Sequence, residues 1–314
     1  MQRYAFGVDI GGTTVKMGLF SSDGLLLEKW EIPTVTENNG EAILPDVADS
    51  ISKKMSEKGI APEQVDGIGL GVPGPVDSEN VVHRCVNLGW GVFDLKAKMN
   101  ELLPSIPNVA AGNDANVAAL GELWLGGGKG YNSAVMFTLG TGVGGGVVIG
   151  GRIVAGANGG GGEVGHIVVN TAETVPCNCG KCGCLEQYAS ATGVVNMAKH
   201  MLSATDIPSA LRDMKKITAK DICDLARDGE EMASAILDRC CEYLGRAMSS
   251  VACAVDPDIF IIGGGMSRAG SVITGGTKKY YQKYAFHVSA NTDIVTAKLG
   301  NDAGIYGCVK MVLG

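Results

Sequence analysis

Four cysteines lie within eight residues of one another, at Cys177, Cys179, Cys182 and Cys184. Side chains two positions apart in an extended segment point the same way, so each Cys-x-Cys pair directs two sulfurs at one point. Clustered thiols of this kind are typical of a zinc site rather than of disulfide bonds. His166 lies eleven residues before the cluster, next to a Gly-Glu-Val-Gly segment. We therefore interpret it as a further metal ligand or as a site residue.

Two glycine-rich turns have the composition of phosphate-binding loops. The first follows Asp9 and reads Gly-Gly-Thr-Thr, so backbone N–H groups and hydroxyls can converge on a phosphate. Asp9 can hold Mg²⁺ directly or through water, although an ordinary hairpin turn is the alternative. The second, at residues 139–145, matches G-x-G-x-x-G, but the dinucleotide-binding form of that pattern needs a helix next. Here Val147 and its neighbours continue as a strand, so the sequence predicts a second phosphate-binding hairpin.

Asn113 and Asp114 lie between the end of a predicted strand and the start of a predicted helix. This is the place where α/β folds gather their ligand-binding residues. Asp114 is either a helix cap or a catalytic carboxylate. A helix N-terminus lowers a carboxylate pKa, which phosphoryl transfer tolerates because the base mainly orients the attacking hydroxyl.

The elements that must position these residues follow a pattern that occurs twice. Strands predicted at residues 4–10, 15–20 and 25–31 are matched later by strands at 132–139, 145–149 and 152–155. Two halves that each begin with a strand, a glycine turn and a strand predict an internal duplication with a cleft between the halves. Further strands are predicted at 65–71, 108–112 and 258–262, and helices at 43–58, 94–103, 114–124, 230–254 and 301–312.

The composition is that of a globular α/β protein. The 314 residues are 46% hydrophobic and 19% charged, enough for a large core in about two domains. The net charge of −7 argues against nucleic acid or a membrane as the main partner. Because a strand begins directly after the N-terminus, we expect no signal peptide and a cytoplasmic location. The six cysteines outside the cluster are then interpreted as buried thiols.

Several motifs occur together and in order: DIGGTTVK, GVPGPVD, GNDANVAALGE, LGTGVGGG, GGEVGH, CNCGKCGCLE and DIFIIGGG. With these motifs the chain resembles the ROK family (repressor, open reading frame, kinase) over almost its whole length, most closely the bacterial glucokinases. The resemblance implies an α/β, actin/hexokinase-like (ribonuclease H-like) duplicated fold with two lobes around a cleft. The smaller lobe would comprise residues 1–112 and the C-terminal helix at about 300–314. The larger lobe, 113–299, would carry the zinc loop and the surface of a homodimer or homotetramer.

The resemblance also implies a role for each matching residue. Asp114 would be the catalytic base, and the sugar ligands would be Asn113, Asp114, Glu163, His166 and Glu186. The phosphates of ATP, with Mg²⁺, would contact Asp9, Gly11, Gly12, Thr13, Thr14, Lys16, Gly140, Thr141 and Gly142, and the adenosine would contact Gly264 and Gly265. A structural zinc would be held by His166, Cys177, Cys179 and Cys184. Cys182 departs from the family pattern, so a four-cysteine site without His166 stays open.

The activity implied is ATP-dependent phosphorylation of glucose to glucose 6-phosphate by in-line transfer. One alternative is a kinase for another hexose or for an N-acetylhexosamine such as N-acetylmannosamine. Another is a sugar-responsive regulator without catalysis, which the presence of both Asp114 and the Asp9 turn disfavours. Repressors of the family carry an N-terminal DNA-binding domain, whereas here the first strand is expected within five residues of the start, which favours the kinase branch.

Overall fold

The computed structural model describes residues 2–314 and divides into two compact units. The first unit consists of residues up to Gly130, Gly146–Gly162 and Asn301–Gly314. The second consists of Tyr131–Gly145 and Glu163–Gly300. In the described part of the chain, none of the helices has the length and apolar character needed to span a membrane.

The first five-stranded sheet has the order β3-β2-β1-β4-β7. Its strands are β1 (Tyr4–Ile10), β2 (Thr14–Ser21), β3 (Leu26–Pro33), β4 (Val65–Val72) and β7 (Val109–Asn113). The first three pair antiparallel, whereas β4 and β7 add to β1 in parallel. The carboxyl ends of β1, β4 and β7 therefore meet at one edge of the sheet, where Asp9 and Asn113 lie.

The second five-stranded sheet has the order β10-β9-β8-β11-β12, which repeats the order of the first. Its strands are β8 (Ala134–Leu139), β9 (Val143–Ile149), β10 (Arg152–Ile153), β11 (Ile259–Gly263) and β12 (Asp293–Thr296). As in the first sheet, the outer hairpin β9–β10 is antiparallel and β11 and β12 add in parallel. This repetition confirms the predicted duplication.

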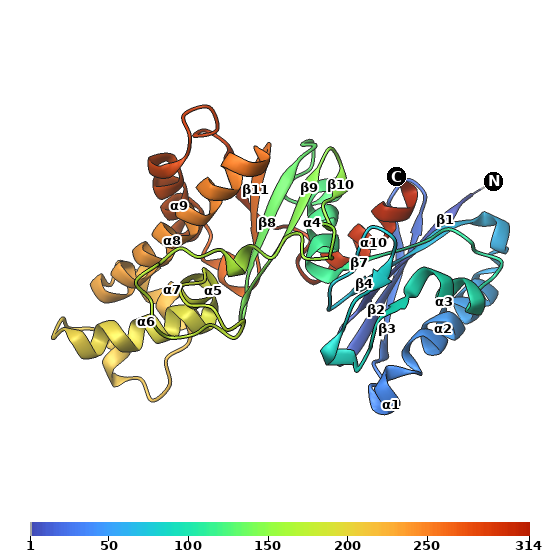
Figure 1. The fold of residues 1–314 in the computed structure, drawn as a ribbon, viewed down its shortest axis with the longest axis horizontal. Helices are drawn as coiled ribbons and strands as arrows, with labels where there is room; N and C mark the ends of the chain where they lie inside the picture. The colour runs from blue at the N-terminus through green and yellow to red at the C-terminus, as the bar shows by residue number, and fades with distance from the viewer. Residues whose placement is uncertain (1) are drawn as a thin grey trace. The chain divides into compact units, whose positions relative to one another are not determined.

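Helices connect and cover the sheets (Figure 1). They are α1 (Glu37–Gly40), α2 (Ile43–Lys58), α3 (Leu95–Leu102), α4 (Asp114–Leu125), α5 (Glu186–Ala189), α6 (Ala191–Ala204), α7 (Ala219–Arg227), α8 (Glu231–Val255), α9 (Ser271–Tyr284) and α10 (Ala303–Leu313). A two-stranded ribbon joins β5 (Val81–Val82) to β6 (Phe93–Asp94). The predicted helices match α2, α3, α4, α8 and α10, while β12 was not predicted because its four residues carry no alternating apolar pattern.

The two faces of the first sheet are packed differently. Phe6 and Val8 join a core that includes buried residues of α2 and α3. On the other face α10 lies directly on the strands, because glycines replace side chains there. A Cβ on Gly69 would lie 1.8 Å from the carbonyl oxygen of Cys308, so a side chain there would force the helix away. This close packing fixes α10 beside the end of β1 that carries Asp9.

The compact units divide the chain differently from the predicted lobes. The helix α4 belongs to the first unit, where it packs so closely on α10 that a Cβ on Gly307 would lie 1.7 Å from the carbonyl oxygen of Val117. These units are defined by the contacts within each of them, whereas the predicted lobes are parts that would move relative to each other. The predicted boundary at residues 112–113 therefore stays a prediction.

Candidate functional site

The Asp9 turn is a tight hairpin between β1 and β2. The Gly11 N–H donates to the carbonyl oxygen of Thr14 at 3.0 Å, which closes the turn. A Cβ on Gly12 would meet nothing within 4 Å, so the backbone there is open on one side. Lys16 is the partner of Asp9 in the β1–β2 pairing, and its Nζ lies 3.3 Å from the carbonyl oxygen of Asn301. The glycine turn and its acidic neighbour thus lie as predicted, and their contacts with a nucleotide stay a prediction.

The structure brings Asp9 and Asp114 together around Gly71 of β4. A Cβ on Gly71 would lie 3.7 Å from Asp9 Oδ1 and 3.8 Å from Asp114 Cα. A Cβ on Gly304 of α10 would lie 2.7 Å from Asp9 Oδ2, so this glycine leaves the space that the carboxylate occupies. Neighbouring carboxylates of this kind suit Mg²⁺, which takes oxygen ligands and retains several waters.

Burial raises the pKa of Asp9 to about 6; the charge of Lys16 lowers it in part, and that of Asp114 adds to the rise. A buried carboxylate whose pKa exceeds its unfolded value of about 3.9 destabilises the fold once it ionises. The free energy of unfolding should therefore decrease as the pH rises from about 4 to about 6.

We accordingly expect Asp9→Asn to stabilise the ligand-free protein at pH 7 by about 1–3 kcal/mol, since a shift of one pKa unit is worth about 1.4 kcal/mol. Urea unfolding of both proteins at pH 7 and pH 4 measures the effect, and the gain should shrink at pH 4. A variant less stable than the wild type at pH 7 would show that Asp9 is a structural carboxylate.

Asn113, rather than Asp114, is the N-cap of α4. Its Oδ1 accepts hydrogen bonds from the N–H groups of Ala115 and Asn116 at 3.1 and 3.2 Å, and its Nδ2 donates to the carbonyl oxygen of Gly74 at 3.2 Å. The Asp114 carboxylate accepts from the N–H of Ala115 at 2.7 Å. The N-cap of α4 is thus Asn113, and Asp114 shares the N–H of Ala115 with it. The role of Asn113 as a sugar ligand stays a prediction.

In the second unit, the three predicted sugar ligands Glu163, His166 and Glu186 line one cavity of about 410 Å³. We name this the catalytic cavity, after the role that we propose for it below. The glycine hairpin between β8 and β9 lines the same cavity, as does Gly264. The structure thus brings together residues that lie more than 100 positions apart in the sequence.

The position of Glu186 depends on a glycine. Its Oε2 accepts a hydrogen bond from the N–H of Val143 at 3.0 Å. A Cβ on Gly142 would lie 2.2 Å from that same oxygen, so only glycine lets the carboxylate reach the hairpin. Glu186 and the hairpin therefore form one rigid wall of the catalytic cavity.

The two glycine segments of the second unit lie against each other. Gly140 donates its N–H to the carbonyl oxygen of Gly142 at 3.0 Å, and the Thr192 hydroxyl donates to the carbonyl oxygen of Thr141 at 2.9 Å. Gly264 has a φ of +79°, and a Cβ there would lie 2.5 Å from the carbonyl oxygen of Leu139. A Cβ on Gly265 would meet nothing within 4 Å, so the backbone beside Gly264 is open. The predicted phosphate and adenosine segments are therefore neighbours.

The ligand atoms of His166, Cys177, Cys179 and Cys184 lie within 4.8 Å of one another. The Cys179 and Cys184 sulfurs are 3.6 Å apart, and the Cys177 sulfur is 3.9 Å from His166 Nδ1. Tetrahedral ligands at about 2.3 Å from zinc lie about 3.8 Å from one another. The donor set and its spacing thus fit a structural zinc ion.

Cys182 lies outside this group. Its sulfur is 3.6 Å from the carbonyl oxygen of Thr174, and its side chain is partly exposed to solvent. The geometry therefore favours the three-cysteine, one-histidine set over the four-cysteine alternative. With Nδ1 toward the sulfurs, the other ring nitrogen of His166 lies 3.9 Å from Glu163 Oε2, on the side of the catalytic cavity.

Gln187 is a supporting residue that the sequence did not single out. Its Oε1 accepts from the N–H groups of Gly183 and Cys184 at 2.8 and 3.0 Å, and its Nε2 donates to the carbonyl oxygen of Val175 at 2.8 Å. These bonds close the cysteine loop on α5. No local pattern distinguishes this glutamine from a surface residue, so the sequence held no signal for it.

Comparisons with known proteins agree with this arrangement. The ROK family pattern matches residues 5–314. The chain is 41% identical to a glucokinase of Halalkalibacterium halodurans, over 97% of this chain and 93% of that protein, and 36% identical to a glucokinase of Thermotoga maritima, over 98% and 96%.

Among solved structures, a ROK family glucokinase from Streptomyces griseus in complex with glucose and AMPPNP is 31% identical, with a TM-score of 0.71 over 98% of each chain. The repeated sheets and this likeness confirm the α/β, actin/hexokinase-like fold. With the family pattern covering almost the entire sequence, the protein belongs to the ROK family.

Proposed function

We propose that this protein transfers the γ-phosphoryl group of ATP to glucose, giving glucose 6-phosphate and ADP. The observation that carries the proposal is the catalytic cavity, which is lined both by a glycine hairpin suited to phosphate and by three side chains suited to hydroxyl groups. The relatives called glucokinases and the solved complex with glucose and an ATP analogue support the same activity.

Glu163, His166 and Glu186 bind the hydroxyl groups of the sugar. A carboxylate accepts hydrogen bonds from hydroxyl groups, and a sugar whose hydroxyl points elsewhere leaves an unpaired buried group that costs roughly 1–3 kcal/mol. Because Glu186 is held by the N–H of Val143, its carboxylate accepts only from a sugar hydroxyl that points toward that position. The open backbone of the hairpin and of Gly265 receives the nucleotide.

In the first unit, Asp114 orients the attacking hydroxyl and accepts its proton late in the transfer. Asp9 and Asp114 would supply oxygen ligands for Mg²⁺, which when bound would neutralise part of the charge of the phosphoryl group. The N–H groups and hydroxyls of Gly11–Thr14 bind phosphate oxygens. Asp9 must be ionised for this role, and in the ligand-free protein burial raises its pKa to about 6.

The zinc ion would be held by His166, Cys177, Cys179 and Cys184, and four protein ligands leave no open position for a reacting water. Its role is structural. When bound, it would hold the loop that precedes Glu186 and keep Nδ1 of His166 toward the metal, which leaves Nε2 available for a sugar hydroxyl.

We also propose a cytoplasmic location, supported by the six cysteines outside the cluster, which are free thiols and, apart from the exposed Cys253, are buried as expected. A homodimer or homotetramer remains our expectation for the assembly, and light scattering of the purified protein measures it.

The experiment that tests the activity is a coupled assay of ADP formation against a panel of sugars with ATP and Mg²⁺. We expect glucose to give the highest kcat/KM. Faster turnover of an N-acetylhexosamine would assign the alternative substrate class, and no turnover of any sugar would assign a sugar-responsive regulator.

The sugar contacts lead to a separate prediction. We expect Glu163→Ala and Glu186→Ala each to weaken glucose binding by roughly 1–3 kcal/mol, because each removes an acceptor of hydroxyl hydrogen bonds. Titration calorimetry of glucose without nucleotide measures the loss. ATP binding without sugar should barely change in Glu163→Ala, whereas a variant that lost ATP and kept glucose would reverse the assignment.

A further inference from the structure

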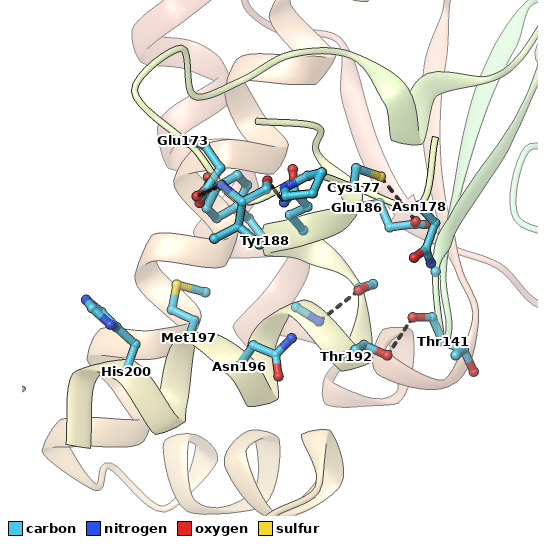
Figure 2. A pocket seen from close by; sticks show the side chains of 16 residues that line it. Thr141, Glu173, Cys177, Asn178, Glu186, Tyr188, Thr192, Asn196, Met197 and His200 are labelled. Atoms are coloured by element: carbon cyan, nitrogen blue, oxygen red, sulfur yellow. Dashed lines mark hydrogen bonds between the residues drawn. The ribbon is translucent and has the colours of Figure 1, made fainter. Parts of the chain in front are cut away.

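A second, larger cavity of about 790 Å³ lies in the same unit, between the loop 173–178 and α6, with α5 beside it. We name it the α6 cavity. Figure 2 shows Thr192, Asn196 and His200 along one side, four residues apart and therefore on one face of α6, and Glu173 and Asn178 on the opposite side. A cavity of this size is within the range of ligand-binding pockets.

The α6 cavity adjoins the catalytic cavity, because Gly142 and Glu186 line both. The two oxygens of Glu186 face different neighbours, since Oε2 accepts from the Val143 N–H and Oε1 lies 3.7 Å from the Cys177 sulfur. Cys177 lines the α6 cavity as well. One carboxylate thus forms the partition between the two cavities.

The charge of the lining restricts what the α6 cavity can hold. Glu173 and Glu186 are acidic, and no lysine or arginine contributes to the lining. Phosphate groups need cationic or N–H donors, and here the Gly193 N–H is already bonded to Ser190. Away from the Thr141–Gly142 edge, which the proposed function gives to the phosphates of ATP, the acidic lining therefore disfavours phosphorylated ligands.

The hydrogen-bonding groups of the lining fall into two sets. Tyr188 donates to Glu173 at 2.6 Å, and both the oxygen and the nitrogen of the Gln187 amide bond to the backbone, so these side chains already have partners within the protein. Asn178 and Asn196, in contrast, are exposed to solvent, and their amides have no hydrogen-bond partner within residues 2–314. Each amide offers two donors and one acceptor, the combination that pairs with sugar hydroxyls.

Apolar surface completes the lining. Val175 is 62% exposed, and it lines the α6 cavity together with Pro176 and Met197. A sugar ring presents C–H groups on its faces and hydroxyls at its edge, so it matches a cavity with apolar patches between free amides.

We propose that the α6 cavity binds an uncharged pyranose ring, as a second sugar subsite beside the catalytic cavity. The proposal rests on the proposed function only for the identity of the neighbouring ligand. The ring reaches the subsite either as a free monosaccharide or as the second residue of a disaccharide whose first ring lies in the catalytic cavity.

Titration calorimetry without ATP, with glucose and with the β-1,4-linked disaccharide cellobiose as probes, tests this proposal. If the wild type binds two equivalents of glucose per chain, the subsite takes a free monosaccharide. If it binds only one equivalent of glucose but also, in a separate titration, one equivalent of cellobiose, the subsite takes the second ring of a disaccharide. In Asn196→Leu and in His200→Leu, the second-ring binding should weaken about tenfold, the loss expected for one hydrogen bond of about 1.4 kcal/mol. Lys199→Ala is the matched control, since Lys199 is exposed on the same helix but outside the lining.

The proposal is overturned if the wild type binds one equivalent of glucose and no cellobiose, or if both α6 variants bind the probes as Lys199→Ala does. Glu163→Ala in the same titrations separates this result from the proposed function. If Glu163→Ala loses glucose binding while both α6 variants are unchanged, only the proposal of a second subsite is wrong. If the α6 variants bind more weakly while Glu163→Ala is unchanged, the sugar site assigned to the catalytic cavity is wrong and the second subsite is supported.

Discussion

Asp114→Asn is expected to lower kcat by at least about 100-fold while glucose binding survives, because the amide keeps the shape but cannot accept the proton. The N-cap of α4 is made by Asn113, so the substitution does not remove the cap. Steady-state assays under saturating ATP and Mg²⁺ give kcat, and titration calorimetry gives glucose affinity. A fall in kcat without a fall in stability separates catalysis from folding.

The same substitution at another helix N-terminus provides the control. Asp94 is the N-cap of α3, where its carboxylate accepts from the Ala97 N–H at 2.8 Å. Asparagine caps helices about as well as aspartate, so Asp94→Asn should retain wild-type kcat. If Asp114→Asn turned over as fast as Asp94→Asn, Asp114 would be a structural residue and the proposed base would be wrong.

Cys184→Ala is expected to lose zinc, stability and glucose affinity together. The wild type should contain one zinc per chain by elemental analysis, since three clustered thiolates are uncompensated charges without the metal. Cys184 is fully buried and directly precedes the segment that carries Glu186, so loss of the metal releases that loop. Each kcal/mol lost should lower Tm by about 1.5 °C, given an unfolding entropy of about 2.1 cal/mol/K per residue over 314 residues.

Cys182→Ala is the matched control, because its sulfur lies against the Thr174 carbonyl oxygen rather than in the cluster. It should keep its zinc, its Tm and its glucose affinity, whereas His166→Ala should lose zinc. Zinc loss in Cys182→Ala with retention in His166→Ala would establish the four-cysteine site instead.

Local chemistry made much of the fold predictable from the sequence. The helix α2 ends at Gly59, whose φ of +65° is the left-handed conformation that glycine adopts readily. Asp94 caps α3 as predicted, and the glycine turns after Asp9 and Leu139 connect antiparallel strands. Each of these features depends on residues a few positions apart, so a pattern in the chain is enough to indicate it.

The candidate site was only partly predictable. The motifs indicated Asp9, Asp114, Glu163 and the cysteines, but whether Asp114 caps the helix could not be decided from adjacent residues. The structure assigns the cap to Asn113 through its bonds to Ala115 and Asn116.

What the sequence by itself determined is the family, the duplicated order of strands and the set of chemically capable residues. Only the tertiary structure decided that His166 rather than Cys182 lies with the other cysteines, and that Asp9 is buried enough to raise its pKa to about 6. It also placed the α6 cavity beside Glu186. The burial of a side chain, its distance from other charges and the shape of a cavity all depend on segments that are far apart in the chain. They exist only once those segments have packed together.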